Sequence, residues 1–283
     1  MLLCTKRFST SVPQGRDQGN TMQSKSDIRN ASASLKDALA SRGQLSCIWF
    51  SLGSPALVEI ALHSHPDVVV IDRQHGLWER STLESVIGVA RHQVPVIVRC
   101  VDNSAQSISE ALDAGAASVL IPLVESAEQA SRAVSSGRYP PAGTRSGGGV
   151  RPLLGGFESM KNDAERIAVG VMIETVAGVE HVESIAATPG LDYLFIGTGD
   201  LALSRGDAAP KQLGIDCARV LAAAHAQGLP CGIFTVSAAD AVQQLANGFD
   251  MVVCANDIET ARSGFEAAST ALRERVRTAS KTL

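Results

Sequence analysis

The sequence lacks several features that would place it at once in a broad class. Its 283 residues carry a net charge of −4, and because basic residues are not in excess we expect no nucleic-acid partner. No apolar run approaches the roughly 20 residues that a membrane-spanning helix needs, so we expect no membrane partner. None of the six cysteines forms a CxxC pair, which indicates reduced thiols that mostly pack in the interior. The composition, 45% hydrophobic and 19% charged, is typical of a globular enzyme.

Nucleotide-binding motifs are also missing. No G-x-G-x-x-G motif follows the first apolar run, which removes support for a doubly wound dinucleotide-binding sheet. The glycines at 147–149 are not followed by Lys-Ser or Lys-Thr, so they do not form a phosphate-binding loop of the P-loop type.

The first thirty residues differ from the rest of the chain. They are rich in Ser and Thr, and Lys6, Arg7 and Arg16 precede the first acid, Asp17. This composition occurs in mitochondrial presequences, but basic, polar tails are common at disordered termini, which favours a frayed terminus ahead of an internal start at Met22. We therefore predict a disordered or targeting tail at 1–30 and one domain at 31–283. We expect a cytoplasmic protein, or one of the mitochondrial matrix if the tail is a presequence.

Eight short apolar runs, enriched in β-branched residues, predict strands buried on both faces. They are Leu45–Phe50, Val68–Ile71, Val94–Val98, Ser118–Ile121, Ala168–Ile173, Tyr193–Ile196, Cys231–Phe234 and Met251–Cys254. Segments of helical periodicity separate most of them: Ser81–His92, Ser104–Ala114, Ala127–Ser135, Cys217–Gln227 and Ala238–Asn247, after a first helix at Leu35–Ala40. Eight such units in a chain of this length predict a (β/α)8 TIM barrel.

Two further segments stand out. The connection from Ser136 to Ala168 is long and rich in Gly and Pro, and we interpret it as a mobile lid or substrate loop. The segment from Asp257 to Thr282 has apolar residues at helical spacing, which predicts a final helix with a charged outer face.

Chemically active side chains follow the predicted strands at the points where the strands end. Trp49 lies near the end of the first strand, and the second ends in Asp72-Arg73-Gln74-His75. Arg99, Glu174 and Asp200 follow the third, fifth and sixth strands. These ends share one rim in a barrel, so we expect the side chains to meet there. A divalent cation would relieve the repulsion between Glu174 and Asp200.

Each of these residues also has a purely structural interpretation. Glu174 can start one helix and Asp200 can cap another, because acids are common at helix starts. Arg99 can form a salt bridge with Asp72 or Asp102, and an Arg after a buried strand needs such a partner. Trp49 can be a packing residue and His75 an ordinary loop histidine.

Four segments are similar to one known family. They are CIWFSLGSPALVEIA, DVVVIDRQHG, the run from VPVIVR through LDAGAASVLIPLVESAEQA to RYPPAGTR, and VMIETVAGVEHVESIAATPGLDYLFIGTGDLALS. On these motifs the chain resembles the HpcH/HpaI aldolases, class II metal-dependent pyruvate aldolases. The resemblance implies a TIM barrel of the phosphoenolpyruvate/pyruvate type. It also implies reversible cleavage of a 4-hydroxy-2-oxo acid to pyruvate and an aldehyde through a metal-stabilised pyruvate enolate.

The resemblance further implies a role for each matching residue. Glu174 and Asp200 match the family's ligands for Mg²⁺, Mn²⁺ or Co²⁺. His75 matches the base, with Asp72 fixing its imidazole, and Arg99 matches the arginine at the oxo group. Trp49 matches a substrate-pocket tryptophan, and the backbone amides of Thr198, Gly199 and Asp200 match those that hold the pyruvate carboxylate.

The chain departs from the family pattern beside these residues. Gln74 stands where many members have Glu, Met172 where many have Gln, and Thr198-Gly199 where many have Pro/Ser-Ala. We place Gln74 and Met172 in the substrate pocket, where the departures bear on the aldehyde and the metal. The resemblance also implies a homo-oligomer, a hexamer or trimer of dimers, with the C-terminal helix exchanged between subunits.

Two other functions compete. A lyase similar to citrate lyase β or malyl-CoA lyase would use a similar Glu/Asp pair on a CoA thioester, but the sequence shows no extra basic nucleotide site. A catalytically silent metabolite-binding barrel would have lost a ligand or base. A Schiff-base aldolase is disfavoured, because no lysine follows a strand and Lys161 and Lys211 are expected in loops.

Overall fold

The computed structural model describes residues 34–279, except the side chains of Arg42, Glu274 and residues 276–279. The tail predicted at 1–30 lies outside the described residues, as do the last three residues of the helix expected at 257–282. All described residues belong to one compact unit, Ser32–Leu283. No helix within residues 34–279 is both long enough and apolar enough to span a membrane.

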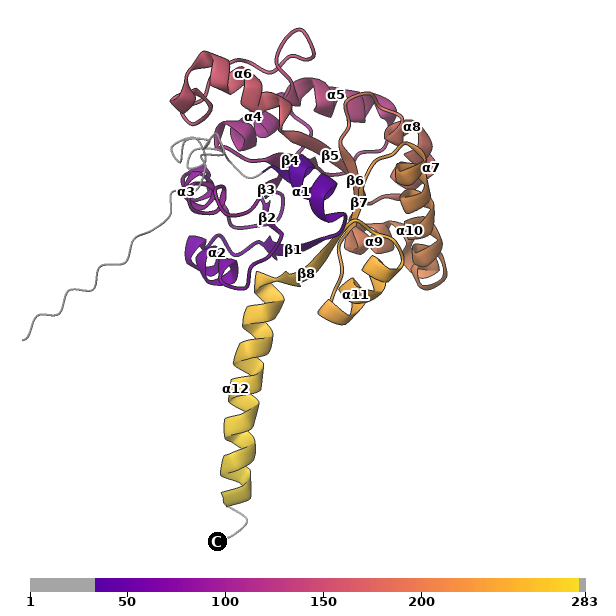
Figure 1. Ribbon diagram of the computed structural model, residues 1–283. Coiled ribbons are helices and arrows are strands. Elements are labelled where there is room, and N and C mark those ends of the chain that lie inside the picture. Colours follow the sequence, from indigo (N-terminus) through magenta and orange to yellow (C-terminus); the bar gives the residue numbers. More distant parts are fainter. Residues whose placement is uncertain (1–33, 280–283) are drawn as a thin grey trace, which may run out of the picture. The chain divides into compact units, whose positions relative to one another are not determined.

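Eight parallel strands close into a barrel in chain order, with β1 paired to both β2 and β8 (Figure 1). The strands are β1 (Leu45–Phe50), β2 (Val68–Asp72), β3 (Val96–Arg99), β4 (Ser118–Ile121), β5 (Ala168–Ile173), β6 (Tyr193–Ile196), β7 (Cys231–Ile233) and β8 (Met251–Asn256). The predicted (β/α)8 fold is confirmed, and four strands have the expected bounds. The third strand begins at Val96 rather than Val94, and the last extends two residues further.

Helices lie between the strands around the barrel (Figure 1). They are α1 (Leu35–Arg42), α2 (Pro55–Leu62), α3 (Arg80–Ala90), α4 (Ala105–Asp113), α5 (Ala127–Gly137), α6 (Phe157–Glu165), α7 (Val176–Glu180), α8 (Val182–Ala186), α9 (Thr198–Arg205), α10 (Ala209–Ala226), α11 (Ala238–Ala246) and α12 (Asp257–Ala279), with short 3₁₀ turns η1 (Pro152–Gly155) and η2 (Gly206–Ala208). Ser54, Ser104, Ser126 and Ser237 each accept a hydrogen bond from an amide in the first turn. These serine caps fix where four of the helices begin.

The side chains of the barrel form two apolar layers. Along β1, Cys47 and Trp49 point into the barrel, whereas Phe50 packs outward against the helices. Glycine makes room for the large rings inside: a Cβ at Gly170 would lie 2.1 Å from the Tyr193 ring. The interior is therefore packed with side chains, as expected for a barrel of this size.

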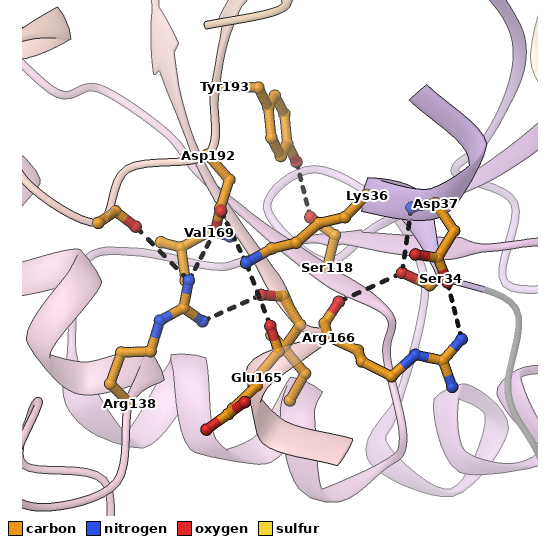
Figure 2. Close-up of polar contacts among 12 residues, drawn as sticks. Ser34, Lys36, Asp37, Ser118, Arg138, Glu165, Arg166, Val169, Asp192 and Tyr193 are labelled. Carbon is orange, nitrogen blue, oxygen red and sulfur yellow. Dashed lines mark hydrogen bonds and ion pairs between the residues drawn. The ribbon is translucent and has the colours of Figure 1, made fainter. Parts of the chain in front are cut away.

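Helix α1 covers the amino ends of the strands, and Leu35 packs fully buried against the interior layer. Lys36 joins this helix to the barrel by a salt bridge of 2.8 Å with Asp192 (Figure 2). Asp192 also pairs with Arg138 at 2.6 Å and accepts the Val169 amide. Since this end of the barrel is covered and cross-linked, the carboxyl ends of the strands are left for a ligand site.

The interpretation of residues 136–168 as a lid is wrong. The segment contains η1 and α6, and its guanidinium groups attach it to α4 and α3: Arg145 pairs with Asp113, and Arg151 donates to the carbonyls of Ala114 and Glu84. The segment follows α5, whose direction returns the chain to the amino ends of the strands. A loop in this position cannot close over the carboxyl ends.

Helix α12 runs outward from the end of β8 instead of lying along the barrel wall (Figure 1). Its contacts with its own chain are chiefly with β1 and β8. Phe265 and Leu272 are exposed on it, Phe265 by 75%. The predicted final helix is confirmed up to Ala279, and an apolar face of it has no partner among the described residues.

Candidate active site

Glu174 follows the last residue of β5, at the carboxyl end of the barrel. Its Oε1 accepts the Leu123 amide at 2.8 Å, and that amide is presented by a backbone with φ of +54°. Its Oε2 is buried and has no hydrogen-bond partner among the described residues. A buried carboxylate oxygen without a donor is costly, so this atom points to a missing ligand.

Asp200 lies near Glu174, in the first turn of α9 after β6. Burial, helped by the neighbouring Asp200 carboxylate, raises the pKa of Glu174 to about 7 against the opposing effects of the Leu123 amide and Arg99. Gly197 is packed against Glu174, since a Cβ there would lie 2.5 Å from Glu174 Oε2. The buried Glu174 and the half-buried Asp200 thus come together at this end of the barrel, as the strand-end argument predicts.

The interpretation of these two acids as helix caps is wrong. Helix α7 has Thr175 at its N-cap, and the Thr175 side chain accepts the Gly178 amide at 3.0 Å. Helix α9 has Gly197 at its N-cap and no side-chain cap. Neither carboxylate is needed to start a helix, and both remain available to a ligand.

Asp72 ends β2 and faces Arg99 on β3 in the sheet register. Its carboxylate accepts six hydrogen bonds: two from Arg99, and one each from Trp49 Nε1, Ser51 Oγ and the amides of Gln74 and His75. Burial alone would raise the pKa of Asp72, but Arg99 and the amide of His75 outweigh it and hold the pKa below its ordinary value. Asp72 is therefore a buried, ionised anchor.

Arg99 is fixed on several sides. Its Nε and Nη2 bond Asp72 at 2.9 and 2.6 Å, and its guanidinium lies 5.0 Å from the centre of the Trp49 ring. The remaining nitrogen, Nη1, has only the thioether of Met172, at 3.9 Å, as its acceptor among the described residues. A thioether accepts weakly, so Nη1 keeps donor capacity for an oxygen of a ligand.

His75 lies on the loop after β2, and it is exposed. Its main-chain N–H donates a hydrogen bond to Asp72, and its ring has no hydrogen bond with a described residue. The prediction that Asp72 fixes the imidazole is therefore corrected: Asp72 fixes the loop, and the ring stays free. Two further bonds hold this loop, from the Leu77 amide to Ser51 O and from Trp78 Nε1 to Phe50 O.

Apolar side chains form the floor beneath the polar groups. Trp49 packs edge-on against Phe234 with 5.4 Å between ring centres, and against Phe195 at 6.0 Å. Met172 belongs to the same buried layer. Gln74, also predicted in the pocket, leaves its Oε1 buried without a partner among the described residues. The floor suits a small ligand with both apolar and oxygen-bearing parts.

The N-terminus of α9 lies next to the carboxylate pair. Thr198 donates its hydroxyl to Phe234 O at 2.9 Å, which leaves the first-turn amides without a side-chain cap. No atom lies within 4 Å of where a Cβ of Gly199 would be, so the backbone there faces open space. Uncapped amides at a helix start attract an anionic group.

Sequence reasoning missed three residues of this site. Leu123 supplies the amide on Glu174 from a left-handed conformation that no local pattern indicates. Ser51 bonds Asp72, and Asp257 holds the Ser51 amide. Asp257 could have been found from the sequence, because it is an acid that directly follows the last strand and side chains at strand ends meet at one rim. Lys161 and Lys211 lie in α6 and α10 rather than in the expected loops, and neither follows a strand.

Known proteins resemble this chain over most of its length. The profile of the HpcH/HpaI aldolase/citrate lyase family matches residues 45–264. A hydroxypyruvate/pyruvate aldolase from Paraburkholderia phytofirmans is 35% identical over 79% of this chain and 91% of its own. A 4-hydroxy-2-oxovalerate aldolase from Novosphingobium aromaticivorans is 35% identical over 66% and 74%.

Solved structures agree. An HpcH/HpaI aldolase/citrate lyase family protein from Burkholderia cenocepacia superposes with a TM-score of 0.79 at 32% identity, covering 84% of this chain and 98% of its own. Sequence and fold therefore point the same way. The chain belongs to the HpcH/HpaI aldolase/citrate lyase family and is a carbon–carbon lyase.

Proposed function

We propose that this protein is a divalent-cation-dependent aldolase that reversibly cleaves a 4-hydroxy-2-oxo acid to pyruvate and an aldehyde. The observation that carries the proposal is the buried, unpartnered Oε2 of Glu174 beside Asp200 and within reach of the charge of Arg99. The names of the relatives support the substrate class, since two of them are a hydroxypyruvate/pyruvate aldolase and a 4-hydroxy-2-oxovalerate aldolase.

Glu174 and Asp200 would hold the cation. Oxygen donors of this kind suit Mg²⁺, Mn²⁺ or Co²⁺, and within residues 34–279 no group of three or more His, Cys, Asp or Glu side chains is arranged to hold a metal ion. A pair of carboxylates leaves other coordination positions for water and substrate oxygens. When bound, the cation supplies positive charge that stabilises the negative charge developing on the 2-oxo oxygen.

The chain's own groups then divide the remaining work. Arg99 Nη1 donates to the 2-oxo oxygen, and the rest of its guanidinium is held still by Asp72 and Trp49. The first amides of α9, at Thr198, Gly199 and Asp200, bind the carboxylate of the substrate. These contacts orient the bond between C3 and C4 over the apolar floor.

Cleavage requires the 4-hydroxyl group to lose its proton. We assign this step to His75, whose ring is exposed and free to accept it. As the C3–C4 bond breaks, its electron pair goes to C3, which takes up a proton and becomes the methyl group of pyruvate, and the 4-oxygen forms the aldehyde carbonyl. In the synthetic direction His75 returns the proton to that oxygen.

We also propose that the functional form is a homo-oligomer, a hexamer or trimer of dimers, in which α12 packs on another copy. Ile258, Phe265 and Leu272 recur every seven residues and therefore share one face of the helix. All three are exposed, because α12 leaves its own barrel. A 23-residue helix with an unpartnered apolar face gains stability by packing against a second barrel.

The test is pyruvate release from a panel of 4-hydroxy-2-oxo acids, measured before and after treatment with EDTA. We expect activity that EDTA abolishes and added Mn²⁺ or Mg²⁺ restores. Full activity after metal removal would overturn the proposal. The same assay with CoA thioesters tests the competing citrate lyase-like reaction, and we expect no turnover of these substrates.

A further inference from the structure

The carboxylate of Asp257 is buried at the start of α12, where it is only 6% exposed. Its Oδ1 and Oδ2 accept the Ser51 amide at 2.9 and 3.1 Å, and Oδ2 accepts the Leu52 amide at 2.8 Å. Within residues 34–279 it forms no salt bridge, so main-chain donors alone offset its burial. The two donors, Ser51 and Leu52, are the first residues of the loop that joins β1 to α2.

Helix capping does not explain this carboxylate. The cap of α12 is Asn256, whose side-chain oxygen accepts the Glu259 amide at 2.8 Å. Asp257 turns instead toward the end of the neighbouring strand β1. An acid in a first turn normally faces solvent and interacts only weakly with the helix dipole.

The loop that Asp257 holds is itself bonded to the segment that carries His75. Ser51 donates its hydroxyl to Asp72 Oδ2 at 3.3 Å, and its carbonyl accepts the Leu77 amide at 2.7 Å. His75 lies between these two attachment points. Movement of Ser51 would therefore displace both ends of the His75 segment and disturb the carboxylate that orients Arg99.

We infer that Asp257 is a positioning residue for the active site: it fixes Ser51, which sets the place of the 72–77 segment and of His75. The inference rests on the proposed function only where activity is the readout. Because Asp257 belongs to α12, the packing of that helix and the geometry of the catalytic segment share one residue.

The test compares Asp257→Asn with Glu259→Gln. Both remove one negative charge from the same helical turn, but the Glu259 side chain is half-exposed and its hydrogen bonds within the described residues come only from Arg262 and Ser263. Asparagine keeps one oxygen acceptor and the shape of the side chain, and the loss of one charged hydrogen bond corresponds to about a tenfold change. We expect kcat to fall about tenfold in Asp257→Asn and to stay unchanged in Glu259→Gln.

Two readouts separate positioning from general destabilisation. The chain has two tryptophans, Trp49 and Trp78, and both lie beside this loop, so the intrinsic fluorescence reports on it directly. We expect Asp257→Asn to change that fluorescence and to speed amide hydrogen exchange over 51–78. Mn²⁺ affinity should change less than twofold, because Glu174 and Asp200 follow other strands.

Ser51→Ala is the second variant, and it removes only the hydroxyl bond to Asp72. The two losses should be less than additive when combined, because both act through Ser51. The inference is overturned if Asp257→Asn matches Glu259→Gln in fluorescence and in exchange over 51–78, or if its main effect is lost Mn²⁺ binding. Absence of aldol cleavage in the wild type would instead overturn the proposed function, while fluorescence and exchange would still decide the role of Asp257.

Discussion

Asp72 and Arg99 face each other across β2 and β3, and Arg99 gives Asp72 two parallel hydrogen bonds of 2.9 and 2.6 Å. Both side chains are buried, and the pair directs the third guanidinium nitrogen away from Asp72. A bidentate pair of this kind needs the planar fork of arginine. The pair therefore holds the guanidinium so that one donor of Arg99 remains available for the contact that we propose with a substrate oxygen.

Arg99→Lys keeps the positive charge but cannot bond Asp72 and the substrate together. We expect kcat/KM for pyruvate release to fall by about 10²-fold or more, as for other losses of a charge stabiliser. Arg132→Lys on the exposed surface of α5 is the control, with activity unchanged. Wild-type activity in Arg99→Lys would show that Arg99 serves only as a structural ion pair.

His75→Ala removes the proposed base without touching the bonds of Asp72, since His75 contributes only its backbone there. The expected loss of kcat for aldol cleavage is on the order of 10²- to 10⁴-fold, the usual range for an acid–base group. The exchange of pyruvate methyl protons in D₂O, followed by NMR, should slow as well. If both rates stay at wild-type values, the proton acceptor is another group.

The raised pKa of Glu174 makes the stability of the metal-free protein depend on pH. Between the ordinary value of 4.5 and about 7, the folded protein holds a proton that the unfolded chain releases. This contribution is complete below pH 4.5 and is lost as the pH rises through 7. Asp72 acts the opposite way, since its lowered pKa contributes stability that is lost as the pH falls below 3.8.

Glu174→Gln should therefore flatten the decline in Tm between pH 5 and about 8 in EDTA, and it should also abolish the stabilisation by Mn²⁺. Glu79→Gln, an exposed change of the same charge, should keep both effects. Thermal denaturation followed by circular dichroism measures them. An unchanged slope in Glu174→Gln would mean that another buried group titrates in this range.

The apolar face of α12 can be tested apart from the chemistry. Phe265→Glu combined with Leu272→Glu places charges on the face proposed to contact a second copy, so we expect smaller assemblies in light scattering after gel filtration. Glu266→Ala, on the same helix, should leave the assembly size unchanged. A wild type that is monomeric at micromolar concentration would contradict the proposed oligomer.

The sequence by itself determined the barrel fold and which residues lie at the carboxyl ends of its strands. Short β-branched runs that alternate with segments of helical periodicity predict the (β/α)8 barrel. Because parallel strands run in the same direction, their carboxyl ends lie at one end of the barrel, together with Trp49, Asp72, Arg99, Glu174 and Asp200. Serine caps likewise set where several helices begin. These are local or directional rules, which act through residues close in the chain.

The tertiary structure decided which partners those rim residues have. Strand register put Arg99, rather than the His75 ring, on Asp72. A left-handed Leu123 put an amide on one oxygen of Glu174, and the path of α5 took residues 136–168 to the other end of the barrel. The start of α12 brought Asp257 to Ser51, 206 positions away. Hydrogen bonds between distant segments depend on angstrom-level register and loop path, which local sequence patterns do not encode.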